Sequence, residues 1–262
     1  MSPTAGGLIL FLISGPLWAQ RAAEFEAATV KVSRNSENGV RGGCHGIDSH
    51  YNPVQAASAP PLGRCVITDA RLSHLIGTAY RLGQMSRIKS GPDWIARGND
   101  RYNVEGKAEN PSVTTEARLL EMLQALLVEQ FKLKFHRETI EEAGFALVVA
   151  KSGAKLQPTT AADANVRISD TLGKPRPGEP VSLTARKCPL PMLANLLSTF
   201  SAHPVIDKTG LQGEYDFTLK WDDTAGPSLS TAIQEQLGLR FESEKVPVSL
   251  FVVDSAEKPG QN

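Results

Sequence analysis

Four side chains that can bind a metal ion lie close together in the first part of the chain. Cys44, His45, Asp48 and His50 fall within seven residues, and Cys65 follows them. Thiolate, imidazole and carboxylate groups are common zinc ligands, so zinc binding is one interpretation of this stretch. The spacing C-H-x-x-D-x-H matches no common zinc pattern, and we therefore expect no metal.

A disulfide between Cys44 and Cys65 is the interpretation that we favour. The bond would close a polar, proline-rich loop of about 20 residues, which stabilises a fold by about 3 kcal/mol on the chain-entropy estimate. Disulfides form in oxidising compartments. The chain has three cysteines, so Cys188 would remain as a free thiol, and we expect it to be buried at the start of a helix.

Residues 207–210 read Asp-Lys-Thr-Gly, the sequence around the phosphorylated aspartate of P-type ATPases. That chemistry needs a magnesium site and a nucleotide-binding scaffold, but the chain has no Walker-type glycine-rich loop, and Leu211 stands where the motif has threonine. A turn explains the same residues: Asp207 would accept backbone N–H groups, and Gly210 and Gly213 would adopt positive φ. We expect the turn.

Two tryptophans beside or near aspartates could line a ligand groove or cover the edge of a core. They are Trp94, which follows Asp93, and Trp221, which ends a predicted strand after Asp207. These four residues form our candidate surface for a ligand or partner. A nucleophile pair of Cys188 and His203 lacks a third group, and no G-x-S-x-G, H-E-x-x-H or S-x-x-K motif occurs. We predict no catalytic residue and no cofactor.

The ends and the charge of the chain bear on its location. Leu8–Trp18 is apolar and uncharged, too short to span a membrane but typical of a secretory signal. We predict a signal peptide over residues 1–19, export to the periplasm or the extracellular space, and no further membrane span. An uncleaved anchor or a misassigned start is the alternative, because the first seven residues lack Lys and Arg. Lys plus Arg equals Asp plus Glu at 28 each, so no basic excess indicates nucleic acid.

The hydrophobic pattern predicts the same order of elements twice. The first half shows strands at 25–32, 65–68, 85–89 and 101–107, helices near 72–79 and at 116–131, and strands at 133–138 and 144–150. The second half shows strands at 181–185, 204–207 and 214–221, helices near 190–200 and at 229–237, and strands at 239–244 and 248–254.

We therefore predict an α+β fold of two related β-α-β-β-α-β-β modules, an internal duplication with mixed or antiparallel sheets packed by helices. The N-terminal module covers residues 24–151 and the C-terminal module residues 181–262. Residues 152–180 are rich in Gly, Pro, Ala and Thr and are interpreted as a linker.

Several ordered motifs resemble a known family. They include FEAATVKVS, GPDWIARGNDRYNVEGKA, LLEMLQALLVEQFKLKFHRET, VIDKTGLQGEYDFTLKW and the closing QEQLGLRFESEKVPVSLFVVDSAEKPGQN. Together, over residues 24–262, they resemble an exported family of unknown function that is expanded in Acidobacteria and named after Solibacter. Residues 181–221 also look like the short N-terminal module of secretins and TonB-dependent receptors, which implies protein interaction.

The sequence thus favours an exported, non-enzymatic interaction module that binds a protein or peptide of the cell envelope. The alternative is a small-ligand-binding protein or a hydrolase whose site lies between the two modules, with Asp48, Asp93, Trp94 and Asp207 as its first candidates.

Overall fold

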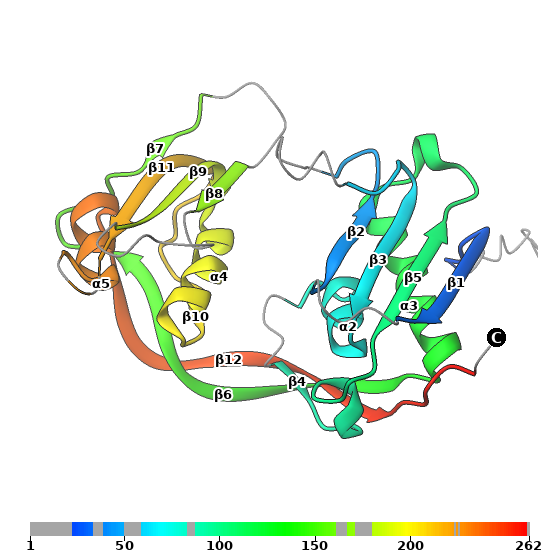
Figure 1. The fold of residues 1–262 in the computed structure, drawn as a ribbon. Helices are drawn as coiled ribbons and strands as arrows, with labels where there is room; N and C mark the ends of the chain where they lie inside the picture. Colours follow the sequence, from blue (N-terminus) through cyan, green and yellow to red (C-terminus); the bar gives the residue numbers. More distant parts are fainter. Residues whose placement is uncertain are drawn as a thin grey trace, which may run out of the picture.

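Two lobes of sheet and helix are joined by one long two-stranded ribbon (Figure 1). The structure is a computed structural model, and it describes residues 23–33, 39–49, 59–82, 87–160, 167–170, 180–222, 224 and 226–260. Helices and strands are mixed, and the sheets are antiparallel or mixed. The predicted α+β class is confirmed.

The first lobe is an antiparallel sheet with helices on one face. Its strand order is β1-β5-β3-β2, formed by β1 (Ala27–Val32), β5 (Tyr102–Lys107), β3 (Arg64–Ala70) and β2 (Arg41–His45). Helices α2 (Leu72–Ala79) and α3 (Glu116–Phe131) bury their apolar faces against it. Short 3-10 turns occur at Asp93–Ile95 and Pro111–Val113.

The second lobe is also an antiparallel sheet on which helices pack. Its strand order is β7-β11-β9-β8, formed by β7 (Gln157–Pro158), β11 (Glu214–Trp221), β9 (Val181–Pro189) and β8 (Arg167–Asp170). Helix α4 (Leu190–Ser201) and helix α5 (Leu229–Ala232) pack on it, and α5 continues as a π-helical turn, Ile233–Leu237. The predicted helix at 229–237 is therefore two helical forms in succession.

The ribbon pairs β6 (Lys134–Val149) with β12 (Leu239–Ser255) along nearly their whole lengths. The sequence predicts two strands in each of these segments, whereas each is one continuous strand. At one end β10 (Val205–Asp207) adds to β6, and at the other end β4 (Ile88–Lys89) adds to β12, both in parallel.

The ribbon carries each half of the chain into the other lobe. Phe251 and Val253 of β12 belong to the core of the first lobe, and Leu147 of β6 belongs to the core of the second. Figure 1 shows β6 leaving the first lobe at the end of α3, and β12 returning from the second lobe to end beside the first. The two halves therefore exchange their closing strands.

Both lobes also place a β-bulge just before a helix. Asp69 and Lys187 have φ of 56° and 53°, and each lies where the strand register shifts. The N–H of Asp69 donates to Asn103 Oδ1, and the N–H of Lys187 donates to Asp216 Oδ1, both at 2.9 Å. A polar side chain on the neighbouring strand thus satisfies the backbone group that the bulge removes from the ladder.

Candidate functional site

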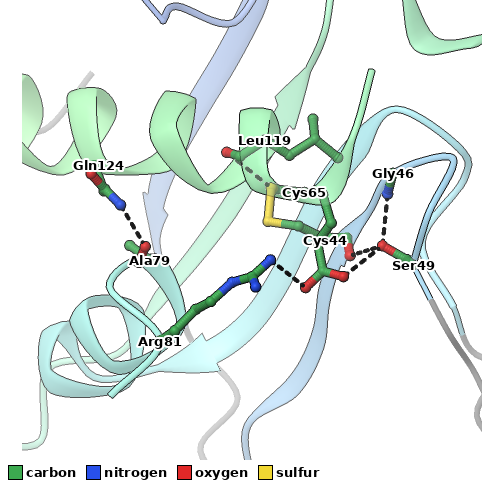
Figure 2. The surroundings of a disulfide bond; sticks show 9 residues. Cys44, Gly46, Ser49, Cys65, Ala79, Arg81, Leu119 and Gln124 are labelled. Carbon is green, nitrogen blue, oxygen red and sulfur yellow. Dashed lines mark hydrogen bonds and ion pairs between the residues drawn. A yellow bond between two sulfur atoms is a disulfide. The ribbon is translucent and has the colours of Figure 1, made fainter. Parts of the chain in front are cut away.

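A disulfide joins Cys44 and Cys65, as the sequence predicts. The two cysteines are directly opposite in β2 and β3 and lie beneath α3, where Cys65 Sγ is 3.8 Å from the carbonyl oxygen of Leu119 (Figure 2). Cys65 is fully buried and Cys44 nearly so. The bond therefore links the edge strand β2 covalently to β3, on the face of the sheet that α3 covers.

The polar residues that follow Cys44 fasten their loop to the start of α3. Asp48 Oδ1 accepts the N–H of Glu116 at 2.6 Å, and the Ser49 hydroxyl donates to Glu116 Oε2 at 3.0 Å. The ring of His45 donates from Nδ1 to the carbonyl of Pro60 at 2.6 Å. His50 lies outside the described residues, within which no group of three His, Cys, Asp or Glu side chains could hold a metal.

The Asp-Lys-Thr-Gly stretch is a turn, as the sequence predicts. Asp207 Oδ1 accepts from the backbone N–H of Thr209 at 2.9 Å and from its hydroxyl at 2.7 Å. Gly210 and Gly213 have φ of 70° and 100°. The carboxylate therefore closes the turn that follows β10.

The two tryptophans of the candidate surface lie in different cores. Trp94 packs beside Tyr102 and Phe131, and Lys258 Nζ lies 5.8 Å from its ring centre. Trp221 is 4% exposed in the core of the second lobe, where it contacts Phe200. Asp93 lies beside Trp94 in the first lobe, and Asp207 is the last residue of β10, which adds to the ribbon near the second lobe.

Cys188 and His203 have different neighbours. Cys188 is fully buried, and its thiol lies 3.6 Å from the carbonyl of Pro189. Burial raises the pKa of this thiol to about 11, although a backbone hydrogen bond with Leu193 opposes the shift. His203 is exposed and stands edge-on to Phe145, with ring centres 5.5 Å apart.

The middle of the ribbon is the surface that the sequence did not reveal. β10 pairs with β6 only at Phe145–Leu147, and β4 pairs with β12 only at Phe251 and Val252. Within the described parts of the chain, no third strand pairs with residues 137–144 of β6 or 239–250 of β12. Among the residues that the structure describes, both outer edges are therefore open between the lobes.

The two open edges differ in their backbone donors. The N–H of Phe145 donates to Pro204 and the carbonyl of Leu147 accepts from Lys208, so odd-numbered residues of β6 direct their backbone groups outward. Glu141 is one of these, and it lies opposite Pro247 of β12. Proline has no N–H, so the outer edge of β12 lacks a donor there, whereas β6 keeps its donors.

A cavity of about 370 Å³ adjoins the open part of β6. The cavity is lined by Ala143–Phe145 of β6, Ser243–Lys245 of β12, and His203. Phe145 stacks on Phe241 at 5.0 Å between ring centres. Gly144 is required, because a Cβ there would lie 2.4 Å from the carbonyl oxygen of Pro204.

An ionisable cluster lies at the other end of the ribbon. His136 Nδ1 is 2.8 Å from Asp254 Oδ1, and His136 Nε2 is 3.0 Å from Glu138 Oε1. Hydrogen bonds to Glu138 and then to Asp254 raise the pKa of His136, whose side chain is 48% exposed. The cluster links β6 to β12 where the ribbon enters the first lobe.

The chain was compared with known protein families. Residues 73–256 match the family described as "Protein of unknown function (DUF3738)". The matched range begins in α2 and ends after β12, so it includes the ribbon and the helices of both lobes, whereas the disulfide lies before it. A search of curated proteins found no match. A search of solved structures found none either.

Proposed function

We propose that this chain, which belongs to the DUF3738 family, is an exported, non-enzymatic interaction module that binds a protein or peptide of the cell envelope at the open edge of β6. The single observation that carries this proposal is the unpaired stretch of β6 between the lobes. The expectation of a family of unknown function is confirmed, whereas its acidobacterial origin and the likeness to secretin modules stay predictions.

An unpaired strand edge offers a row of backbone donors and acceptors to an incoming strand. Natural proteins block such edges with proline, lysine or a covering element. Pro247 removes a backbone donor from the edge of β12, whereas the corresponding part of β6, RETIEEAG, contains no proline and keeps its backbone donors. Binding at β6 would use the backbone for affinity and the neighbouring side chains for selectivity.

Export is supported by two features. The disulfide suits an oxidising compartment, and Leu8–Trp18 has the character of a signal segment. None of the helices within the described residues has the length and apolar character to cross a membrane.

The alternative function is binding or hydrolysis of a small molecule between the lobes. The cavity beside Phe145 favours this alternative, because its volume of about 370 Å³ falls within the range of ligand sites. The candidate acids Asp48, Asp93 and Asp207 do not line this cavity.

Partner capture tests the proposal. The mature chain would be immobilised and exposed to envelope extract of its native host, beside a Glu141→Pro variant that removes an outward N–H of β6. Ser249→Pro is the matched control, because Ser249 lies in the same orientation on the edge that Pro247 already blocks. We expect wild type and Ser249→Pro to retain the same partner and Glu141→Pro to lose it. Equal retention by all three would overturn binding at β6.

A further inference from the structure

Three alternate residues in the open stretch of β6 lie on one face of the ribbon between the lobes (Figure 1). They are Arg137, Thr139 and Glu141, and the side chains of all three are exposed. As odd-numbered residues of β6, they also direct their backbone N–H and C=O groups outward, toward the open edge. A strand that pairs with this edge would therefore meet a cation, a hydroxyl group and an anion in turn.

The ribbon supplies no partner for either of these charges. On β12, Arg137 lies opposite Phe251 and Glu141 lies opposite Pro247, and neither charge forms an ion pair with a described residue. The two charges are four residues apart on an extended strand, about 13 Å, so they cannot pair with each other. Opposite charges can reach both of them from a strand on the outer side of β6.

The order of these three residues is complementary to itself. If a second copy of β6 ran antiparallel along the edge, with the two Thr139 residues facing each other, Arg137 of each copy would lie opposite Glu141 of the other. Facing residues of opposite charge stabilise a pair of strands, and so do facing threonines. The two-fold symmetry of such a pair would form the same ion pair twice.

Other registers bring like charges together. A two-fold centre at Ile140 would set Glu138 against Glu142 of the other copy, and a centre at Glu141 would set that residue against itself. A centre at Glu138 would do the same for Glu138. Like charges that face each other directly destabilise strand pairing. The charge pattern therefore favours the centre at Thr139.

The backbone of the open stretch fits the same register. With their outward groups, Arg137, Thr139 and Glu141 of two copies would exchange about six hydrogen bonds. Pairing over residues 137–141 stops short of Phe145, whose outward N–H is already bonded to Pro204. A second copy and β10 would therefore use separate parts of the edge of β6.

We propose that a second copy of this chain occupies the open edge of β6 when no envelope partner is bound. The two β6 strands pair antiparallel about Thr139, and two Arg137–Glu141 ion pairs fix their register. The strands β12, β6, β6 and β12 then form one four-stranded sheet. This inference rests on the proposed function, since it concerns the same edge, and it makes release of the second copy the step that controls access to the edge.

Sedimentation of the mature chain over a range of concentrations tests the dimer. We expect wild type to dimerise. Arg137→Glu and Glu141→Arg each place like charges at both symmetric contacts, so each alone should raise the dimer dissociation constant about 10-fold or more. Lys31→Glu, an equal change of charge at an exposed residue of β1, should leave it unchanged.

An equimolar mixture of Arg137→Glu and Glu141→Arg gives the sharpest result. In the mixed dimer every contact again joins opposite charges, so the mixture should dimerise as tightly as wild type, although neither variant does so alone. A wild-type chain that stays monomeric at its highest concentration would overturn the inference. So would dimerisation that the two single variants leave unchanged, or a mixture that dimerises as weakly as its components.

A cross-link locates the two-fold axis. The Cα atoms of the two Thr139 residues would be about 5.5 Å apart, a separation that a disulfide can span. Under mild oxidation, Thr139→Cys should give a covalent dimer on a non-reducing gel. Ser249→Cys, which lies opposite Thr139 on β12 and is also exposed, should not. Equal cross-linking of the two variants would overturn the assigned register.

The inference and the proposed function can fail separately. If wild type is monomeric and Thr139→Cys forms no covalent dimer, while envelope capture is still lost in Glu141→Pro, self-association is overturned and edge binding stands. If the mixture of charge variants dimerises as predicted but capture yields no partner, the dimer is supported and the envelope role is overturned.

Discussion

At the bulge before α4, the side chain of Asp216 accepts a hydrogen bond from the backbone. The N–H of Lys187 donates to Asp216 Oδ1 at 2.9 Å, where the backbone has a φ of 53°. This hydrogen bond is the main reason that the pKa of Asp216 lies below its ordinary value, and the hydroxyl of Thr159 and the charges of Arg186 and Lys187 add to it. The ionised carboxylate therefore stabilises the fold.

We expect this contribution to disappear in acid. A carboxylate whose pKa is lowered by folding stabilises the native state above its unfolded pKa of about 3.9, and the contribution is lost as the pH falls through the folded pKa. Asp216→Asn keeps an acceptor oxygen but no charge, so its melting temperature should fall less than that of wild type between pH 6 and pH 3. Asp93→Asn, at an exposed carboxylate, is the control in circular-dichroism melts. Identical pH profiles for Asp216→Asn and wild type would contradict the assignment.

Cys188 should be inert in the folded protein. Its side chain is fully buried, and its pKa is raised to about 11, so little thiolate exists at pH 8. Three cysteines less the two in the disulfide leave one free thiol. We expect iodoacetamide to add no label to the native chain and one label in guanidinium, as read by intact mass. Rapid labelling without denaturant would show that the thiol is accessible.

Among the elements, the sequence predicts the helices of the first lobe well and the ribbon poorly. Leu119, Leu123 and Leu127 recur on one face of α3, so the helical period is visible. In β6, the stretch 137–143 is mostly charged and exposed because it lies between the lobes, and it contributes no alternating apolar signal. The sequence therefore suggests a break in a strand that continues.

Only those parts of the candidate site that are formed by residues close together in the sequence could be predicted. The disulfide follows from two cysteines that bound one loop, and the turn after Asp207 follows from its own residues. The cavity at Phe145 depends on β10, β6 and β12, which come together from distant parts of the chain. No short sequence motif indicates that these three strands come together. Once the strand register is known, the stacking of Phe145 on Phe241 and of Phe251 on Phe135 does indicate that the ribbon carries a similar aromatic pair at each end.

The disulfide should stabilise β2 against its sheet. It closes a loop with a sequence separation of 21, and a bond of this kind contributes about 3 kcal/mol. The Cys44→Ala, Cys65→Ala double variant should therefore unfold at lower urea concentration, by an amount that corresponds to this free energy. Wild type kept fully reduced with a phosphine should behave like the double variant. An unchanged urea midpoint in both would contradict this role.

At the scale of the whole molecule, the exchange of β6 and β12 makes each lobe depend on the other half of the chain. Phe251 and Val253 complete the first core from a strand that starts in the second. Leu147 completes the second core from a strand that starts in the first. A two-stranded ribbon is marginally stable by itself, so its order depends on both of its ends.

The two lobes should consequently unfold together. Phe251→Ala removes a fully buried ring from the first core, and such changes cost about 3–5 kcal/mol. In the mature chain, Trp94 reports on the first lobe and Trp221 on the second, so Trp94→Phe and Trp221→Phe backgrounds give one probe for each. We expect the urea midpoints of the two fluorescence probes to coincide, and to shift together in Phe251→Ala. The control is Val32→Ala, which changes a side chain that is 56% exposed and should shift neither midpoint. If Phe251→Ala shifts only the Trp94 midpoint, the lobes are independent folding units that the ribbon merely links, and a partner strand at β6 could then bind while one lobe is unfolded.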